Sequence, residues 1–141
     1  MKVAITGGTG FVGRYVVKEL LDRGLEVSVL TTCPENIQQF HWRDKVKIIK
    51  VDINVPISKE FLIQLSGIQK LIHLAWTGLP NYNNPIHYEK YLMPQYHFLK
   101  SIIEFGICDS TTLLSWFRMY LLCHAPMVLN MVLIPGMVTN D

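Results

Sequence analysis

The amino-acid sequence predicts an α/β fold in which a parallel β-sheet carries helices on both faces. A short apolar run at 2–6 is followed at once by three glycines with the spacing G-x-x-G-x-x-G. A helical apolar repeat then covers 11–23, and a second strand-like run follows at 26–30. A strand, a helix and a strand in this order imply two parallel strands joined by a right-handed crossover.

The remaining elements follow the same alternation. The helix at 11–23 has an apolar stripe made of Phe11, Val12, Tyr15, Val16, Leu20 and Leu21. Further strands are expected at 46–51 and 70–74, and a short helix at 58–65 is expected to begin at the capping residue Ser58. A last helix over 87–105 is expected to kink at Pro94 and to stop at Gly106. Its apolar stripe has Gln95 as the imperfect member and consists of Tyr88, Leu92, Gln95, Leu99, Ile102 and Ile103.

Length and composition favour one globular domain. The chain has 141 residues, half of them hydrophobic, and a net charge of only +2, so no nucleic-acid partner is expected. Its cysteines (Cys33, Cys108 and Cys123) lack metal-ligand spacing, and no metal site is predicted. Unpaired thiols and the lack of a signal-like N-terminus favour the cytoplasm.

The pattern changes after Gly106. We therefore expect a domain over 1–105 and a divergent apolar tail over 106–141, with the sheet incomplete at its C-terminal edge. The segment 113–132 is long enough for a membrane span, but Arg118 near its middle costs roughly 2.5–3.5 kcal/mol on insertion. A tail without a membrane span is the preferred interpretation.

The glycines predict a phosphate-binding turn. Gly7 allows a sharp turn after the first strand, Gly10 lets a pyrophosphate approach the backbone, and Gly13 lets the helix pack close to the sheet. The helix N-terminus adds free N–H groups and partial positive charge. No Gly-Lys-Ser/Thr follows, so the turn is not a P-loop.

The sequence TGGTGFVG at 6–13 resembles the cofactor fingerprint of extended short-chain dehydrogenases, the NAD-dependent epimerase/dehydratase family. Val51-Asp52-Ile53 resembles the family's acidic motif after the third strand, and Leu71–Ala75 its fourth-strand motif. The resemblance covers 1–105 and implies a Rossmann-type sheet, NAD or NADP as cofactor, and a nucleotide sugar as substrate. The implied cofactor site comprises Gly7, Gly10, Phe11, Val12, Gly13, Thr32, Asp52, Ile53, Leu74, Ala75 and Trp76.

Two features of the sequence leave the choice of cofactor and the role of the loop after the fourth strand undecided. The family's usual acidic residue after the second strand is replaced by Leu30-Thr31-Thr32, so the choice between NAD and NADP is not predicted. Arg14 or Arg43 either meets a 2′-phosphate or is surface charge. The residues Trp76, Thr77, Asn81 and Tyr82 either line a nicotinamide or sugar pocket or form a surface loop, whereas His73 is expected to be a packed core residue.

The family's catalytic residues are a Ser/Thr on the fifth strand and a Tyr-x-x-x-Lys pair on the next helix. Here Tyr96 and Lys100 have this spacing but lie one unit too early, so they are weighed as candidates against an ordinary aromatic and a solvated lysine. The preferred hypothesis is an N-terminal fragment, in which a divergent or out-of-frame end replaces the fifth strand and the substrate domain. Three functions remain open: an epimerase, dehydratase or reductase, a non-catalytic dinucleotide-binding module, and an unstable truncated product.

Overall fold

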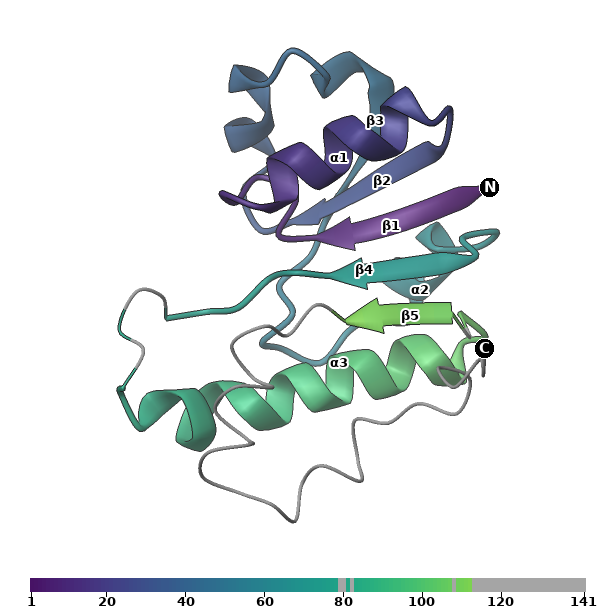
Figure 1. The fold of residues 1–141 in the computed structure, drawn as a ribbon. Coiled ribbons are helices and arrows are strands. Elements are labelled where there is room, and N and C mark those ends of the chain that lie inside the picture. The colour runs from purple at the N-terminus through teal and green to yellow at the C-terminus, as the bar shows by residue number, and fades with distance from the viewer. Residues whose placement is uncertain (79–80, 82, 108, 113–141) are drawn as a thin grey trace, which may run out of the picture.

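The computed structural model describes residues 1–78, 81, 83–107 and 109–112. Within them lies a five-stranded sheet in the order β3-β2-β1-β4-β5, and every neighbouring pair is parallel. The strands are β1 (Lys2–Thr6), β2 (Glu26–Thr31), β3 (Val46–Lys50), β4 (Lys70–His73) and β5 (Asp109–Thr112). The strand order reverses between β1 and β4, at the centre of the sheet (Figure 1).

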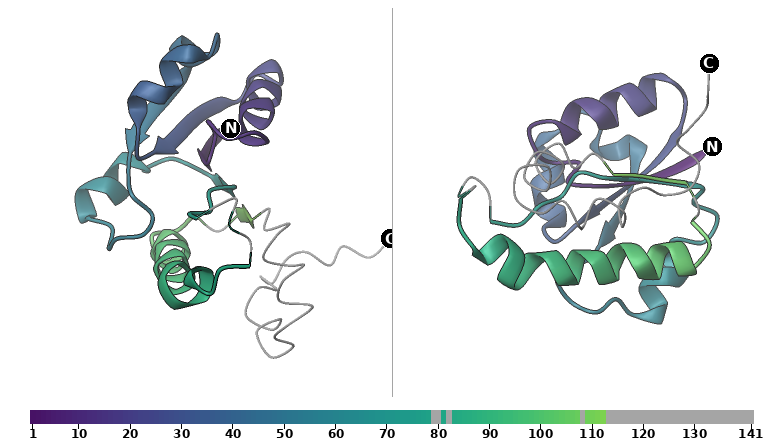
Figure 2. Two further views of the ribbon diagram at one scale, coloured as in Figure 1. Left: turned by 90° about the vertical axis from the view of Figure 1, so that its left-hand side faces the viewer. Right: turned by 60° about the horizontal axis from the view of Figure 1, so that its bottom comes forward.

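Helices cover both faces of this sheet (Figure 2). One face carries α1 (Gly13–Asp22) and the 3₁₀ helix η1 (Pro34–Gln39), and the 3₁₀ turn η2 (Arg43–Lys45) precedes β3. The other face carries α2 (Lys59–Gln64) and α3 (Met93–Glu104). The π-helical segment η3 (His87–Leu92) leads directly into α3, and Pro94 stands where the two meet. This arrangement confirms the predicted α/β fold.

Alternation along β1 divides the core into two clusters. Ala4 packs with Leu71 and Phe98 beneath α3, whereas Ile5 faces α1 and packs with Val17. Successive strand side chains point to opposite faces, so a strand with helices on both sides is apolar throughout. The burial of β1 from Val3 to Thr6 follows from this position at the centre of the sheet.

The first turn of the predicted helix differs from the structure. The helix α1 begins at Gly13 instead of residue 11, and the side chains of Phe11 and Tyr15 are 77% and 60% exposed. Val17, which was outside the predicted stripe, is the apolar side chain of α1 that is fully buried. The segment that leads into α1 lies past the carboxyl end of β1 (Figure 1). The side chains at the start of the predicted stripe are therefore exposed and do not pack against the sheet.

The expectation that a divergent end replaces the fifth strand is wrong. β5 pairs with β4 in parallel, from Lys70 with Asp109 to His73 with Thr112. Its sequence, Asp-Ser-Thr-Thr, has no apolar run by which a strand could be recognised. The domain boundary at residue 105 stays a prediction.

Some sequence-based expectations fall on residues outside the described ranges, namely Tyr82, Cys108, Cys123 and the tail from 113, with its candidate span at 113–132. Among the helices that the structure describes, none is long and apolar enough to cross a membrane.

Candidate functional site

The glycine turn follows the carboxyl end of β1, beside the segment that follows β4. The strand order reverses between these two strands, and open α/β sheets bind ligands in the crevice at this point. The turn also leads directly into α1, whose first N–H groups have no intrahelical acceptor. The sequence and the topology therefore place the candidate site at the same edge.

Gly7 lies against the backbone that follows β4. Its φ of +70° is in the left-handed region, and a Cβ atom on it would stand 2.7 Å from the amide nitrogen of Ala75 and 2.8 Å from the carbonyl carbon of Leu74. A side chain is therefore excluded both by conformation and by space. The turn meets the Leu74–Ala75 peptide in direct contact.

The rest of the turn folds back on Gly7. The Gly10 amide donates to the Gly7 carbonyl oxygen at 3.0 Å, and a Cβ atom on Gly13 would overlap that same oxygen. The N-terminus of α1 is thereby packed onto the turn, as a backbone that binds a pyrophosphate requires. This geometry agrees with a sharp turn at Gly7 and close packing at Gly13, whereas the approach of a pyrophosphate to Gly10 stays a prediction.

The outer side of the turn is aromatic and basic. The Arg14 guanidinium lies 5.2 Å from the Phe11 ring centroid and 5.0 Å from that of Tyr15, within cation–π range. Its Nε atom is buried and has no hydrogen-bond partner within the described ranges. Val12 caps α1 and is half exposed. The side chains that follow the glycines are thus open to a ligand or to solvent.

A second part of the predicted site follows β3. Asp52 is exposed, whereas Ile53 is buried in the core beside α2. An Asp52 carboxylate oxygen accepts from the amide and the side chain of Asn54, and the Asn54 Nδ2 donates to Thr77 Oγ1 at 2.9 Å. The loops after β3 and β4 are therefore joined, which brings Asp52 to the same edge as Ala75.

At the end of β2, the Thr31 hydroxyl accepts a hydrogen bond from the Cys33 amide at 3.2 Å. Thr32 is exposed, and its hydroxyl contacts Cys33 Sγ at 3.7 Å. By the resemblance, these residues stand where the family carries an acid, and a place for Thr32 beside a ribose stays a prediction.

The loop after β4 is held by its own hydrogen bonds. Trp76 Nε1 donates to His87 Nδ1 at 3.0 Å, and the loop carbonyl of Asn81 accepts from His87 Nε2 at 2.7 Å. Trp76 is partly buried, while Leu74 and Ala75 flank the glycine turn. His87 was not predicted as a site residue. Its only signal in the sequence is a polar side chain at the first position of a predicted helix.

The prediction that His73 is a packed, hydrogen-bonded core residue is confirmed. His73 is 1% exposed and bonds both Thr6 and Gln95, so it joins β1 to α3. Burial lowers the pKa of His73 below its ordinary value of 6.5, and the hydrogen bond to Gln95 opposes this to a smaller degree. Thr6 and Gln95 were not predicted as site residues, although Gln95 interrupts an otherwise apolar helical repeat.

Tyr96 and Lys100 lie on the exposed side of α3. The Tyr96 ring contacts His97, and Lys100 Nζ lies 3.8 Å from a carboxylate oxygen of Glu104. These contacts are within α3 itself, and none of the described contacts joins either residue to the glycine turn. Their catalytic role stays a prediction.

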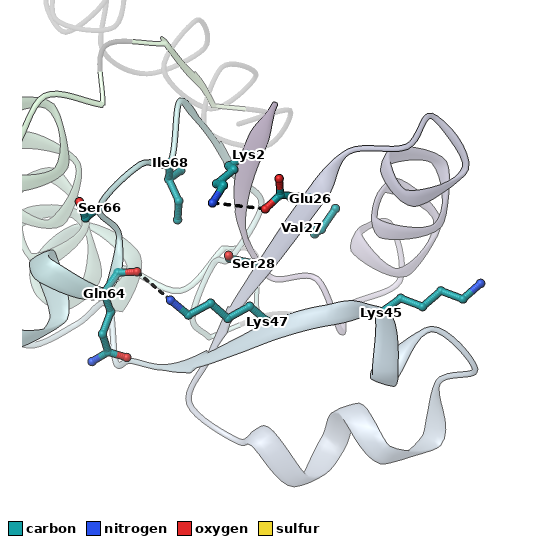
Figure 3. Close-up of a pocket in the computed structure, with 9 residues that line it drawn as sticks. All are labelled: Lys2, Glu26, Val27, Ser28, Lys45, Lys47, Gln64, Ser66 and Ile68. Carbon is teal, nitrogen blue, oxygen red and sulfur yellow. Dashed lines mark hydrogen bonds and ion pairs between the residues drawn. The ribbon is translucent and has the colours of Figure 1, made fainter.

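A surface pocket lies at the opposite end of the strands (Figure 3). In it Lys2 lies 3.4 Å from a carboxylate oxygen of Glu26, and Lys47 Nζ donates to the Gln64 carbonyl oxygen at 3.1 Å. Lys2 and Glu26 begin β1 and β2, whereas the glycine turn follows the end of β1. The pocket is therefore separate from the candidate cofactor site.

Comparison with known proteins agrees with this geometry. The model of the NAD dependent epimerase/dehydratase family matches residues 3–93. A dTDP-6-deoxy-L-talose 4-dehydrogenase (NAD(+)) of Aggregatibacter actinomycetemcomitans is 36% identical over 108 residues, which cover 76% of this chain and 38% of that protein. A UDP-glucuronic acid decarboxylase 1 of Arabidopsis thaliana is 30% identical over 93 residues, 63% of this chain and 19% of that protein.

Solved structures share the fold of this chain. A UDP-glucose 4-epimerase of Thermus thermophilus in complex with NAD superposes with a TM-score of 0.56 at 26% identity, covering 76% of this chain and 35% of that one. A UDP-glucose-4-epimerase of Stenotrophomonas maltophila with bound NAD gives 0.66 at 15% identity, covering 79% and 36%. The chain thus spans well under half the length of these relatives. From its glycine turn, its strand order and the family match over 3–93, the chain belongs to the NAD dependent epimerase/dehydratase family.

Proposed function

We propose that this chain binds NAD or NADP across the edge between β1 and β4, as the nucleotide-binding part of an enzyme that acts on a nucleotide sugar. The observation that carries the proposal is the contact of Gly7 with the Leu74–Ala75 peptide, beside the N-terminus of α1. A Cβ atom at Gly7 or Gly13 would occupy space that the turn needs. The residues present therefore fit a dinucleotide.

Each part of the edge has a role in this proposal. The turn from Gly7 to Gly13, with the amides of Phe11 and Val12, holds the pyrophosphate. Asp52 and Ile53 meet the adenine, Thr32 lies towards the ribose, and Ala75 and Trp76 face the nicotinamide side. When bound, the cofactor supplies hydride transfer to or from a sugar carbon, and the chain's residues orient it and exclude water. The names of the relatives, which act on dTDP- and UDP-linked compounds, support a nucleotide sugar as substrate.

Calorimetric titration with NAD and NADP, oxidised and reduced, tests binding. A ligand at a hundredfold excess over its Kd stabilises the protein by about 2.7 kcal/mol, so the melting temperature should also rise. In Gly10→Asp a side chain is forced within 3.2 Å of the Gly7 carbonyl, and a negative charge meets the pyrophosphate. We expect this variant to lose the effect of the cofactor.

Gly24→Asp is the matched control. It introduces the same side chain at the far end of α1, where a Cβ atom has nothing within 4 Å. Gly24 has a φ of +74°, which aspartate tolerates better than most residues. If the wild-type chain shows no response to any of the four nucleotides, or if Gly10→Asp responds like Gly24→Asp, the proposal fails.

A non-catalytic dinucleotide-binding module is the second candidate. It is supported by Tyr96 and Lys100, which are exposed and whose described contacts are within α3. A hydride-transfer assay of the chain and of its Tyr96→Phe variant separates the two. A rate that the Tyr96→Phe change abolishes would favour catalysis by this pair.

A further inference from the structure

A row of three buried polar side chains connects α3 with the Leu74–Ala75 peptide, on which the glycine turn rests. Thr6 ends β1, His73 ends β4 and Gln95 lies in α3, and their exposed fractions are 1%, 1% and 3%. His73 Nδ1 lies 2.7 Å from Thr6 Oγ1, and its Nε2 lies 3.0 Å from Gln95 Oε1. The cofactor contacts described above use none of these side chains.

The bonds made by Thr6 decide where the protons lie. Thr6 Oγ1 accepts from the amides of Leu74 and Ala75, each at 3.2 Å, and the Leu74 amide is shared with the Thr6 carbonyl oxygen, also at 3.2 Å. The hydroxyl proton of Thr6 needs an acceptor, and among the described partners of Oγ1 only His73 Nδ1 can accept it, so Thr6 donates to His73 Nδ1. His73 is then neutral with its proton on Nε2, which donates to Gln95 Oε1. The row is a directed chain of bonds from Thr6 through His73 to Gln95.

The same two amides form the surface on which the glycine turn rests. A Cβ atom on Gly7 would stand 2.7 Å from the Ala75 nitrogen, one of the atoms that Thr6 holds. A displacement of the Leu74–Ala75 peptide would therefore change the separation of the glycine turn from the segment after β4. The position of this peptide therefore decides how the glycine turn sits at the edge of the sheet.

We infer that His73 and Gln95 are positioning residues for dinucleotide binding, which hold the Leu74–Ala75 peptide in place under the glycine turn by fixing the proton of Thr6. The inference rests on the proposed function for its ligand. A neutral His73 keeps the Thr6 lone pairs free for the amides of Leu74 and Ala75. A protonated His73 carries a proton on Nδ1 as well, so Thr6 loses its acceptor and Nδ1–H competes with the two amides for Oγ1. The Leu74 amide keeps the Thr6 carbonyl oxygen as a second acceptor, whereas the Ala75 amide depends on Oγ1, and its bond is weakened.

The surroundings of His73 favour the neutral form. Among the side chains that the structure describes, its ring meets Thr6 of β1, Gln95 of α3 and Phe98 of α3, whose ring centroid lies 5.7 Å away, and none of these three is charged or titratable. Gln95 Nε2 has no hydrogen-bond partner within the part of the chain that the structure describes. Gln95 is thus held to the row by its oxygen, and a substitution there acts on His73 directly.

The experiment uses the full chain, with Gln95→Met and Gln95→Glu as the main variants. Gln95→Met keeps the length of the side chain and removes the acceptor. Gln95→Glu keeps the acceptor but adds a carboxylate beside His73, which favours its protonated form. His97→Gln is the control, because His97 is an exposed histidine of the same helix. Two quantities are measured from pH 6 to pH 8. The first is the protection factor of the Ala75 amide without cofactor, which is its hydrogen exchange corrected for the intrinsic, base-catalysed rate at each pH, and the second is the Kd for NAD by calorimetry.

We expect Gln95→Met to speed exchange at Ala75 and to weaken NAD binding by about threefold to tenfold, as the loss of one hydrogen bond implies. In Gln95→Glu the faster exchange at Ala75 and the weaker NAD binding should be strong at pH 6 and fade towards pH 8. The reason is that deprotonation of His73 restores the hydrogen bond that Nδ1 accepts from Thr6. A merely structural role for Gln95 would not produce this pH profile. In the wild-type chain and in His97→Gln, the protection factor of the Ala75 amide and the Kd for NAD should each change by less than about twofold across this range, within the usual effect of a surface substitution.

The outcomes separate the two proposals. If NAD binds but Ala75 exchange and affinity in both Gln95 variants match the wild type, the positioning role is overturned and the proposed function stands. If no NAD binding is detected while Ala75 exchange follows the expected pH profile, the proposed function fails and the control of Ala75 by the row stands. If the Gln95 variants do not fold, Thr6→Val and Thr6→Ser decide. Thr6→Val should lower the protection of the Ala75 amide from hydrogen exchange, whereas Thr6→Ser, which keeps the hydroxyl, should retain it. Equal protection in the two variants would overturn the inference.

Discussion

Trp76 Nε1 donates a hydrogen bond to Nδ1 of His87 at 3.0 Å, and this bond fixes which nitrogen of His87 carries its proton. Because Nδ1 accepts, Nε2 carries the proton and donates to the Asn81 carbonyl oxygen at 2.7 Å. A Cβ atom on Gly78 would stand 3.0 Å from His87 Cε1. The start of the loop after β4 is therefore held against the first residue of η3.

His87→Ala should open this loop. The substitution removes two hydrogen bonds of roughly 1 kcal/mol each, so we expect the free energy of unfolding to fall by about 2 kcal/mol in urea titrations. His97→Ala is the matched control, because His97 is exposed, and it should cost less than about 0.5 kcal/mol. Equal losses in the two variants would show that the contacts of His87 add nothing to stability.

The start of α2 allows a second test. Ser58 caps this helix, and its Oγ accepts from the Phe61 amide at 3.2 Å. Ser58→Ala removes the cap and should lower the free energy of unfolding by about 1 kcal/mol. Ser66→Ala makes the same change at an exposed position just after the helix and should be close to neutral. A loss for Ser66→Ala as large as that for Ser58→Ala would contradict the role of the cap.

Local signals account for most of what the sequence predicted correctly. Ser58 begins a helix because its own hydroxyl satisfies an amide three residues away, and Gly7 adopts a positive φ because no side chain hinders it. The apolar runs of β1 and β4 are recognisable because helices cover both faces of the sheet. Such features depend on neighbours in the sequence, and the glycine turn was found for this reason.

The parts that sequence reasoning missed depend on distant partners. β5 is a polar tetrapeptide, and it is a strand through its pairing with β4, some forty residues earlier. Gln95 was taken as an imperfect apolar position, whereas its Oε1 bonds His73, 22 residues away. Phe98, which packs against both Phe61 and His73, was likewise absent from the predicted stripe. None of these pairings leaves a periodic signal in one sequence.

Gly13→Ala tests the close packing of α1 on the glycine turn. The added methyl group would overlap the Gly7 carbonyl oxygen, and backbone atoms must shift to admit it. Overpacking of this kind typically costs about 1–3 kcal/mol, and we expect NAD binding to be lost as well. The free energy of unfolding and calorimetric titration check the two effects.

Glu19→Ala is the control for this change. Glu19 lies on the exposed side of α1 and makes a surface ion pair with Arg23, so its loss should cost less than about 1 kcal/mol and leave NAD binding intact. If Gly13→Ala binds NAD as tightly as Glu19→Ala, the turn can accommodate a side chain and the assigned role of Gly13 is wrong.

The stability of the chain should fall in mild acid because of His73. Burial holds the pKa of His73 below 6.5 in the folded chain, whereas in the unfolded chain the imidazole titrates near its ordinary value. Between these two values the unfolded state binds more protons, so the free energy of unfolding rises with pH. The contribution is complete above pH 6.5, is lost as pH falls from there towards the folded pKa, and changes no further below it.

Urea titrations at a series of pH values from 5 to 8 measure this contribution. The slope from one group is at most about 1.4 kcal/mol per pH unit. His73→Asn removes the group and should flatten the curve below pH 6.5, whereas His97→Gln removes an exposed histidine and should leave the slope unchanged. A slope that persists in His73→Asn would assign the acid sensitivity to another residue, because this variant differs from the wild type at residue 73 alone.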